Sequence, residues 1–292
     1  MDDAEPSASA LRGAIEARLK TLDRELDDED PRTLFRFLLK MARHELARVD
    51  EPPIRADLLD RFEALLHERP PASLDHAQLF IDAPSALRRA ELILRSSRGG
   101  PILALGDDDA VSLALLLMSA ASIEGAACIE GAACIEVADI DEALLAFLEQ
   151  SARTLGCELK THRIDLFEES PGPALLDRFE IVFTDPPRSY EDGLAFIAYA
   201  ARCLAPSQTS RLFYADHEDW NDEHDALREA LRGLGLEPIA EMKNAARYPL
   251  IERWIPSLDE RAAALELDPE DLRALIALNP ARSHLYELAL RV

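Results

Sequence analysis

Three consecutive aspartates, Asp107, Asp108 and Asp109, stand where the sequence changes from an apolar run to a helical pattern. A single glycine, Gly106, precedes them, so the order of residues predicts a strand, a tight turn and a helix. Turns of this kind that bind phosphate supply glycines and bare backbone N–H groups instead. Three carboxylates repel a phosphate and attract a cation. The ligand expected at this turn therefore carries an amine or a sulfonium, unless the acids serve only as caps of the helix.

Acidic residues also follow the next three predicted strands. Asp139 and Asp141 come after the second strand, Asp165 after the third, and Asp185 after the fourth. In a doubly wound sheet the carboxyl ends of the strands share one edge, and ligands bind outside that edge. An acid after the second strand suits ribose hydroxyls, and one after the third can accept the exocyclic amine of adenine. Each acid could alternatively be a helix cap or a loop residue.

The tripeptide Asp185-Pro186-Pro187 closes the fourth predicted strand. Two prolines exclude a helix and fix the backbone in an extended conformation, so they hold the preceding carboxylate at the strand tip. A carboxylate held there can accept a hydrogen bond from an attacking amine, orient its lone pair and take its proton. The same tripeptide could instead be a rigid loop in which Asp185 has no chemical role.

These acids must be positioned by the strands and helices that precede them. Strands and helices alternate from residue 74 onward, a pattern typical of a parallel sheet covered by helices on both faces. The predicted strands span residues 101–105, 135–138, 158–163, 179–184, 211–214, 238–243 and 285–292. The sequence therefore predicts an α/β fold with a doubly wound, mainly parallel, seven-stranded sheet.

Residues 1–73 are predicted to form a separate N-terminal helical domain, and residues 74–292 a Rossmann-like domain. Apolar residues recur at helical spacing in three stretches before the proline-rich linker at residues 69–73. A helical region of this kind usually packs on a neighbour, so we expect a homodimer. Farther along, residues 123–128 are repeated as residues 129–134. This duplication is too short for a repeat fold and is expected to lengthen a loop.

The chain carries a formal net charge of −24 at pH 7, from 32 basic and 56 acidic residues. A field of this sign repels nucleic acid and anionic membrane surfaces and attracts small polycations. The first residues lack the basic and apolar regions of a secretory signal, and no stretch approaches a membrane span in length. The four cysteines have no Cys-x-x-Cys spacing and are expected to be reduced. These features predict a cytoplasmic protein that binds neither nucleic acid nor membranes.

Three motifs resemble those of the branched-chain polyamine synthases, also called N4-bis(aminopropyl)spermidine synthases. They are Gly-Asp-Asp-Asp at 106–109, Asp-Ile-Asp at 139–141 and Asp-Pro-Pro at 185–187, and the similarity covers residues 74–214. The resemblance implies a methyltransferase-like Rossmann fold. It also implies a transferase that moves aminopropyl groups from decarboxylated S-adenosylmethionine to a secondary amine of a polyamine such as spermidine. The family usually follows Pro-Pro with Tyr and Thr, whereas this chain has Arg188-Ser189-Tyr190.

The resemblance implies a role for each acid at the strand tips. Asp185 and Asp108 would be the catalytic residues, with Asp185 holding the nucleophilic amine. The residues implied to bind the donor are Gly106, Asp107, Asp139, Asp141 and Asp165. The residues implied to bind the acceptor are Asp109, Pro186, Pro187 and Tyr190.

Transfer of an aminopropyl group from a sulfonium requires a neutral amine held next to the reacting carbon more than it requires a Lewis acid. The sulfonium already provides an excellent leaving group, because it departs as a neutral thioether. We therefore expect no metal and no permanently bound cofactor, with decarboxylated S-adenosylmethionine as co-substrate. An acidic turn favours this donor over S-adenosylmethionine, which carries an additional carboxylate. Two alternatives remain open: an S-adenosylmethionine-dependent N-methyltransferase on the same fold, and a non-catalytic protein that binds polyamines.

Overall fold

The structure is a computed structural model of the chain. It describes residues 54–73, 75–121, 134–187, 189–217, 224–249 and 281–291, with a few more between 259 and 273. The chain divides into two compact units, one of Pro53–Tyr248 and Arg282–Val292, the other of Met1–Pro52 and Pro249–Ala281. The first unit holds the sheet and every predicted site residue. The first two predicted N-terminal helices and the duplicated segment lie outside the described residues, and the domain boundary at residue 73 stays a prediction.

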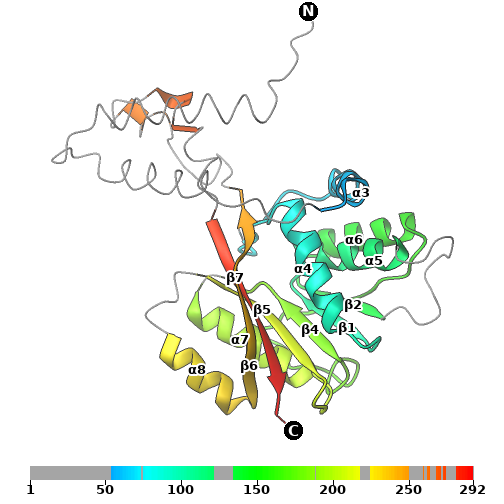
Figure 1. Ribbon diagram of the computed structural model, residues 1–292, viewed down its shortest axis with the longest axis vertical. Helices are drawn as coiled ribbons and strands as arrows, with labels where there is room; N and C mark the ends of the chain where they lie inside the picture. The colour runs from blue at the N-terminus through cyan, green and yellow to red at the C-terminus, as the bar shows by residue number, and fades with distance from the viewer. Residues whose placement is uncertain are drawn as a thin grey trace, which may run out of the picture. The chain divides into compact units, whose positions relative to one another are not determined.

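A seven-stranded sheet forms the centre of the larger unit, in the spatial order β3-β2-β1-β4-β5-β7-β6 (Figure 1). Its strands are β1 Ile102–Leu105, β2 Ile135–Asp139, β3 Lys160–Arg163, β4 Ile181–Thr184, β5 Arg211–His217, β6 Leu236–Tyr248 and β7 Ala281–Leu290. Neighbouring strands from β3 to β5 are parallel, whereas β7 is antiparallel to β5. The predicted α/β fold is confirmed. Because the strand order reverses between β1 and β4, the site where such sheets bind ligands lies at their carboxyl ends.

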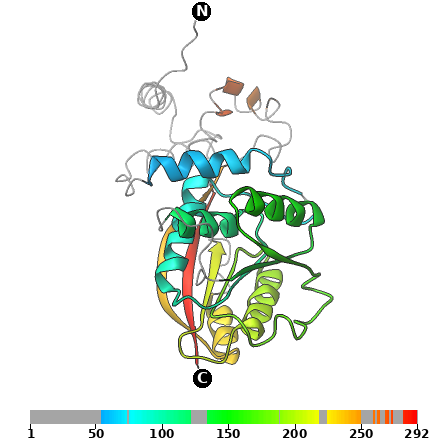
Figure 2. The same ribbon diagram turned by 90° about the vertical axis from the view of Figure 1, so that its right-hand side faces the viewer.

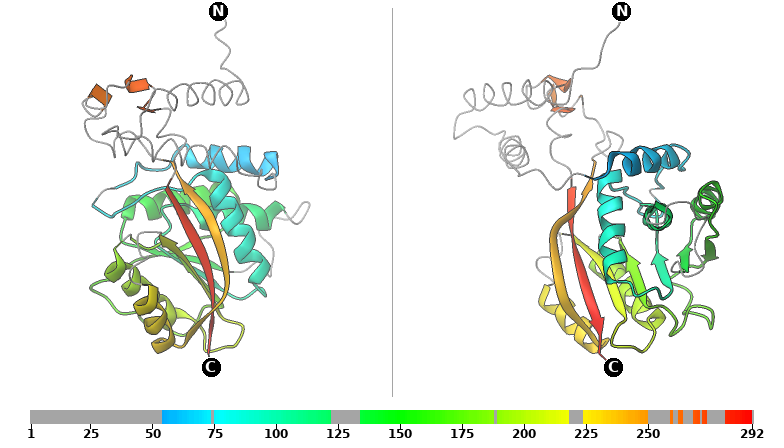
Figure 3. Two further views of the ribbon diagram at one scale, coloured as in Figure 1. Left: turned by 60° about the vertical axis from the view of Figure 1, so that its left-hand side comes forward. Right: turned by 45° about the vertical axis from the view of Figure 1, so that its right-hand side comes forward.

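Helices cover both faces of this sheet. On one face lie α4 Ala83–Ser96, α5 Val111–Ala121 and α6 Glu142–Thr154, and on the other α7 Tyr190–Cys203 and α8 His224–Gly233 (Figures 1 and 3). A further helix, α3 Ala56–Leu66, packs against α4 and α5 (Figure 2). The helix that follows the three aspartates, α5, is apolar on nearly all sides, and its first seven residues are buried. Such a helix must lie inside the domain, so the turn before it is held firmly.

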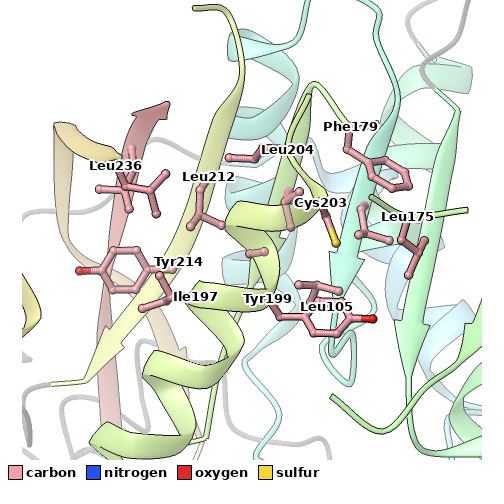
Figure 4. Close-up of a cluster of buried hydrophobic side chains, with 14 of the residues drawn as sticks. Leu105, Leu175, Phe179, Ile197, Tyr199, Cys203, Leu204, Leu212, Tyr214 and Leu236 are labelled. Carbon is pink, nitrogen blue, oxygen red and sulfur yellow. The ribbon is translucent and has the colours of Figure 1, made fainter. Parts of the chain in front are cut away.

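The strands that carry the site are themselves buried. Every residue of β1 and β4 is buried, as expected for central strands of a parallel sheet. Between the sheet and helices α7 and α8 lies a large apolar cluster that includes Leu105, Leu212 and Tyr214 (Figure 4). The rigid packing beneath the strand tips fixes the backbone from which the acidic side chains project.

Some boundaries differ from the predictions. β6 and β7 have 13 and 10 residues, and both begin before the predicted starts. β6 is an edge strand whose first half is largely exposed, so its apolar pattern marks only part of its length. Cys134 and Cys203 are free, but Cys157 is disulfide-bonded, so the expectation of four reduced cysteines is wrong for that residue. Within the described residues, no helix is long and apolar enough to cross a membrane.

Candidate active site

The register of the sheet brings the predicted turns together. Leu105 of β1 is paired with Ala138 of β2 and with Thr184 of β4. The next residue of each strand therefore lies at the same carboxyl edge. These residues are Gly106, Asp139 and Asp185.

The first turn is fastened to the second strand and to helix α5. The backbone N–H of Asp107 donates to Asp139 Oδ2 at 3.2 Å, and the Asp107 carboxylate accepts from the backbone N–H groups of Val111 at 2.8 Å and Ser112 at 3.1 Å. Gly106 has φ +68°, a left-handed conformation that favours glycine. Asp107 is thus a buried cap of α5, which is the role that sequence reasoning kept open as an alternative.

The second acidic pair is also engaged with backbone. Asp139 accepts at Oδ1 from the Asp141 backbone N–H at 2.9 Å. Asp141 caps α6 through Oδ1, while its Oδ2 accepts from the Gln78 side chain at 3.0 Å. Asp165 is half-buried and accepts from the backbone N–H of Phe167 at 3.0 Å. Carboxylate oxygens have spare lone pairs, so these bonds orient Asp139 and Asp165 without closing them to a ligand.

A buried arginine on α4 joins the first turn to the fourth strand. The Arg89 guanidinium lies 3.1 Å from Asp109 Oδ2 and 2.9 Å from Asp185 Oδ2, and the three side chains are 3%, 3% and 9% exposed. The Tyr248 hydroxyl donates to the same Asp185 Oδ2 at 2.6 Å. Asp109 Oδ1 accepts from the Ile81 backbone N–H at 2.7 Å. Asp109 is therefore engaged with protein groups in the interior, and its predicted contact with the acceptor stays a prediction.

The carboxylate of Asp108 is different from those of its two neighbours. It is half-buried, and it makes no hydrogen bond or ion pair with any residue that the structure describes. Its backbone carbonyl accepts from Arg69 Nη1 at 3.1 Å, which fixes the residue's backbone. Of the three consecutive aspartates, this one alone presents a carboxylate that is not already used by the described protein.

Burial controls the ionisation of these acids. Burial raises the pKa of Asp107 to about 7, and burial with the nearby Asp185 raises that of Asp109 to about 8, because one guanidinium serves two carboxylates. Burial and the neighbouring acids, Asp109 first, hold the pKa of Asp108 well above its usual range. Burial also raises the pKa of Asp139. A cationic ligand would relieve the repulsion among these carboxylates, so the electrostatics of this edge favour the binding of a cation.

The remaining predicted residues line the fourth strand's turn. Pro186 is buried, Pro187 is half-buried, and Tyr190 is the first residue of α7 and packs against the core. Arg188 lies outside the described residues. In the part of the chain that the structure describes, no group of three or more His, Cys, Asp or Glu side chains is arranged to hold a metal ion. The expectation of a reaction without a metal stays a prediction.

Sequence reasoning missed several residues at this edge. Two of them are arginines: Arg69 stacks on the Phe80 ring, 3.6 Å from its centroid, and Arg89 pairs with Asp109 and Asp185. Phe167 and Ile140 are 56% and 37% exposed although both are large and apolar, and they follow β3 and β2. For Ile140 and Phe167 the sequence did offer a signal, because each apolar residue lies within two positions of an acid at the end of a strand. The arginines gave no such signal, because Asp108 and Asp109, to which Arg69 and Arg89 donate hydrogen bonds, are 39 and 20 residues away along the chain.

Comparison with known proteins identifies a family and several relatives of this chain. Residues 57–230 match the family described as branched-chain polyamine synthase A C-terminal domain. The chain is 30% identical to the N(4)-bis(aminopropyl)spermidine synthase of Thermococcus kodakarensis over 159 residues, which are 53% of this chain and 41% of that protein. It is 33% identical to the enzyme of the same name from Thermus thermophilus over 147 residues, 50% of this chain and 38% of that protein. The chain thus spans about two fifths of the length of these relatives.

Solved structures show the same fold. A crystal structure of the branched-chain polyamine synthase from Thermus thermophilus, in complex with N4-aminopropylspermidine and 5′-methylthioadenosine, aligns with a TM-score of 0.62 at 23% identity. The alignment covers 80% of this chain and 63% of that one. A protein from Pyrococcus horikoshii, provisionally assigned as an RNA methyltransferase, aligns with a TM-score of 0.52 at 13% identity, covering 82% of this chain and 100% of that one. The fold is methyltransferase-like, and because the family match covers more than half of its residues, the chain belongs to the branched-chain polyamine synthase A C-terminal domain family.

Proposed function

We propose that this chain transfers aminopropyl groups from decarboxylated S-adenosylmethionine to an amine of a polyamine, with spermidine as the first acceptor to test. The observation that carries the proposal is the carboxylate of Asp108, which has no partner among the described residues at the strand edge of a member of this family. An ammonium group of the substrate would be the positively charged partner that this carboxylate does not have among the described residues. The net charge of −24 also favours a polycationic substrate.

The proposed reaction is a single displacement. The lone pair of the acceptor nitrogen attacks the aminopropyl carbon that is bonded to sulfur, and the carbon–sulfur bond breaks as the carbon–nitrogen bond forms. The electron pair of the broken bond stays on sulfur, so the sulfonium becomes the neutral thioether of 5′-methylthioadenosine. Positive charge moves to the nitrogen. A carboxylate beside that nitrogen therefore stabilises the transition state more than the ground state, in which the amine is neutral.

Asp185 is the residue proposed for this position. Its carboxylate is held at the edge by Arg89 and Tyr248, and Pro186 and Pro187 restrict its backbone. It would accept a hydrogen bond from the attacking nitrogen, aim the lone pair at the carbon and take the proton that the amine loses. Asp108 would pair with a cationic amino group and so anchor the substrate. Asp109 is assigned to the internal ion pair and not to the substrate.

The donor's nucleoside is proposed to lie over the ends of β2 and β3. Asp139 would bind the ribose hydroxyls and Asp165 the adenine amine. Asp141 would contribute indirectly, since its carboxylate caps α6 and bonds to Gln78. The exposed side chains of Ile140 and Phe167 would form apolar walls for the base.

Replacing Phe167 tests this position for the nucleoside. The Phe167 ring packs edge-on against the Phe196 ring, with 5.8 Å between the ring centroids. Phe196 in turn lies beside the first turn, since its Cε1 atom would be 3.4 Å from a Cβ placed on Gly106. We expect Phe167→Ala to weaken binding of 5′-methylthioadenosine roughly tenfold by calorimetry, because stacking of a base on an aromatic ring contributes about 1–3 kcal/mol. Leu176→Ala is the matched control, since Leu176 is 40% exposed but precedes β4, at the opposite edge. Equal affinities in both variants would contradict the assignment.

The raised pKa values of the acids predict how stability depends on pH. A carboxyl whose pKa is higher in the folded state than its unfolded value of about 3.9 binds more protons when folded, so stability falls as pH rises through that window. For Asp107, with a folded pKa of about 7, and Asp109, at about 8, the window extends from about pH 4 to about pH 8. Glu136 has the opposite effect on stability, confined to lower pH. Burial raises its pKa, but hydrogen bonds from Arg178, His162 and Lys160 outweigh burial and lower the pKa to about 2.

We therefore expect the unliganded protein to have a lower Tm at pH 8 than at pH 5.5. Spermidine should raise the Tm more at pH 8, where the acids are ionised and can pair with ammonium groups. Thermal unfolding with and without spermidine at the two pH values measures both effects. A stabilisation by spermidine that is larger at pH 5.5 would contradict the proposed charge pairing.

Product analysis decides between the proposed reaction and its rivals. The chain is incubated with spermidine and either decarboxylated S-adenosylmethionine or S-adenosylmethionine, and products are identified by mass spectrometry. Aminopropylated spermidine supports the proposal. Methylated product with the carboxylated donor would favour an N-methyltransferase, and binding without any product would favour a polyamine-binding protein.

The predicted homodimer is a further proposal, which sedimentation of the full chain tests.

A further inference from the structure

We propose that Arg89 is a positioning residue of the transfer reaction, because it holds the Asp185 carboxylate against the first turn through a two-sided ion pair with Asp109. This inference rests on the proposed function, because Asp185 is assigned there to the attacking amine. Arg89 itself is assigned no contact with either substrate.

The geometry is that of a bridge between two loops. Arg89 Nη1 is 3.1 Å from Asp109 Oδ2, and Nη2 is 2.9 Å from Asp185 Oδ2. A planar guanidinium can place two nitrogens toward two carboxylates at once, which the single ammonium of lysine cannot do with the same geometry. The two carboxylates belong to turns after different strands, β1 and β4, so the bridge fixes the distance between those turns.

The position of Arg89 is also rigid. It lies in the middle of α4, is 3% exposed, and is surrounded on its helix by the buried residues Ala86, Leu87, Ala90 and Ile93. Tyr248 adds a third restraint, since its hydroxyl donates to Asp185 Oδ2 at 2.6 Å and lies 3.0 Å from Ser283 Oγ. Two elements far apart in the sequence, α4 and β6, thus converge on one carboxylate, and Ser283 of β7 holds the Tyr248 hydroxyl.

Charge explains why the bridge matters for transfer. Two buried carboxylates next to each other would repel, and one of them would bind a proton or turn away. Arg89 compensates one negative charge, so Asp185 can stay beside Asp109 in a defined orientation. Without that compensation, the carboxylate that should stabilise the developing charge on nitrogen loses its fixed position, and a displacement of about 1 Å can lower a rate about 100-fold.

The test compares Arg89→Lys with the wild type and repeats the comparison in an Asp185→Asn background. We expect Arg89→Lys to lower kcat about 10- to 100-fold, with KM for the donor and affinity for 5′-methylthioadenosine changed less than about threefold. In the Asp185→Asn background the same substitution should lower kcat less than about threefold, because the group on which Arg89 acts is already lost. An equal loss in both backgrounds, or full activity of Arg89→Lys, would overturn the inference.

Two further measurements cover the other outcomes. Should Arg89→Lys fail to fold, Asp109→Asn releases one side of the bridge while keeping the arginine, and it should lower kcat about tenfold with donor binding unchanged; full activity there counts against the inference. If the wild type binds spermidine but forms no product, the proposed function fails, and the inference is judged on spermidine affinity. Arg89→Lys should then weaken that affinity about tenfold, but only when Asp185 is present.

Discussion

Asp185→Asn is expected to lower kcat for aminopropyl transfer roughly 10²- to 10⁴-fold, the range found for loss of a positioned acid or base group. An amide keeps the size of the side chain but removes the negative charge that faces the developing ammonium and the oxygen that can take the proton. Donor binding uses other residues in our assignment, so affinity for 5′-methylthioadenosine should change less than about threefold. Steady-state kinetics with decarboxylated S-adenosylmethionine and spermidine, together with calorimetry, measure both quantities.

A control for Asp185 must remove a nearby negative charge without touching the proposed site. Glu191 lies in the first turn of α7 and is exposed. Glu191→Gln should therefore keep the wild-type rate, because surface charges are screened by solvent and salt. If Asp185→Asn kept the wild-type kcat, or if it lost donor affinity and rate in equal measure, its role at the attacking nitrogen would be refuted.

The second large effect is expected at Asp108, where function and stability should change in opposite directions. Asp108→Asn should raise the KM for spermidine about 10- to 100-fold, since a hydrogen bond to a charged group contributes about 1.5–3 kcal/mol. The same change should leave the Tm equal or higher at pH 8. Burial and neighbouring acids hold the pKa of Asp108 well above its usual range, so its ionised form is disfavoured in the folded protein. A residue that reduces stability in this way is typical of a binding site.

Asp109 provides the matched control, because it is the next residue but has partners. Asp109→Asn removes one side of the ion pair with Arg89, but Asp185 remains as a partner of the arginine. Because burial and the nearby Asp185 raise the pKa of Asp109 to about 8, this change should not lower the Tm at pH 8 either. Its KM for spermidine should rise less than that of Asp108→Asn, because Asp109 acts on the substrate only through the bridge with Arg89. Thermal unfolding and kinetics on the two variants separate the roles. A larger loss of spermidine affinity in Asp109→Asn than in Asp108→Asn, or a lower Tm of Asp108→Asn at pH 8, would contradict the assignment of Asp108 to the substrate.

The strand-tip acids show how far local sequence could lead. The alternation of strands and helices placed Asp139, Asp165 and Asp185 at one edge because successive parallel strands end on the same side of a sheet. Local spacing also left helix capping open for each of these acids, and the structure shows that Asp107 bonds to the first turn of α5 and that Asp141 caps α6. What local pattern could not give was which acid was a cap and which was open.

Periodicity and short motifs were enough to predict the fold class, the edge at which the acids gather and the family resemblance, because each of these depends on residues close together along the chain. The folded chain was needed to show that Asp109 pairs with Arg89, that Tyr248 donates to Asp185, and that the carboxylate of Asp108 has no partner among the described residues. Tyr248 and Asp185 are 63 residues apart. Such pairings arise when packed helices and strands bring distant segments together, and no spacing along the chain encodes them.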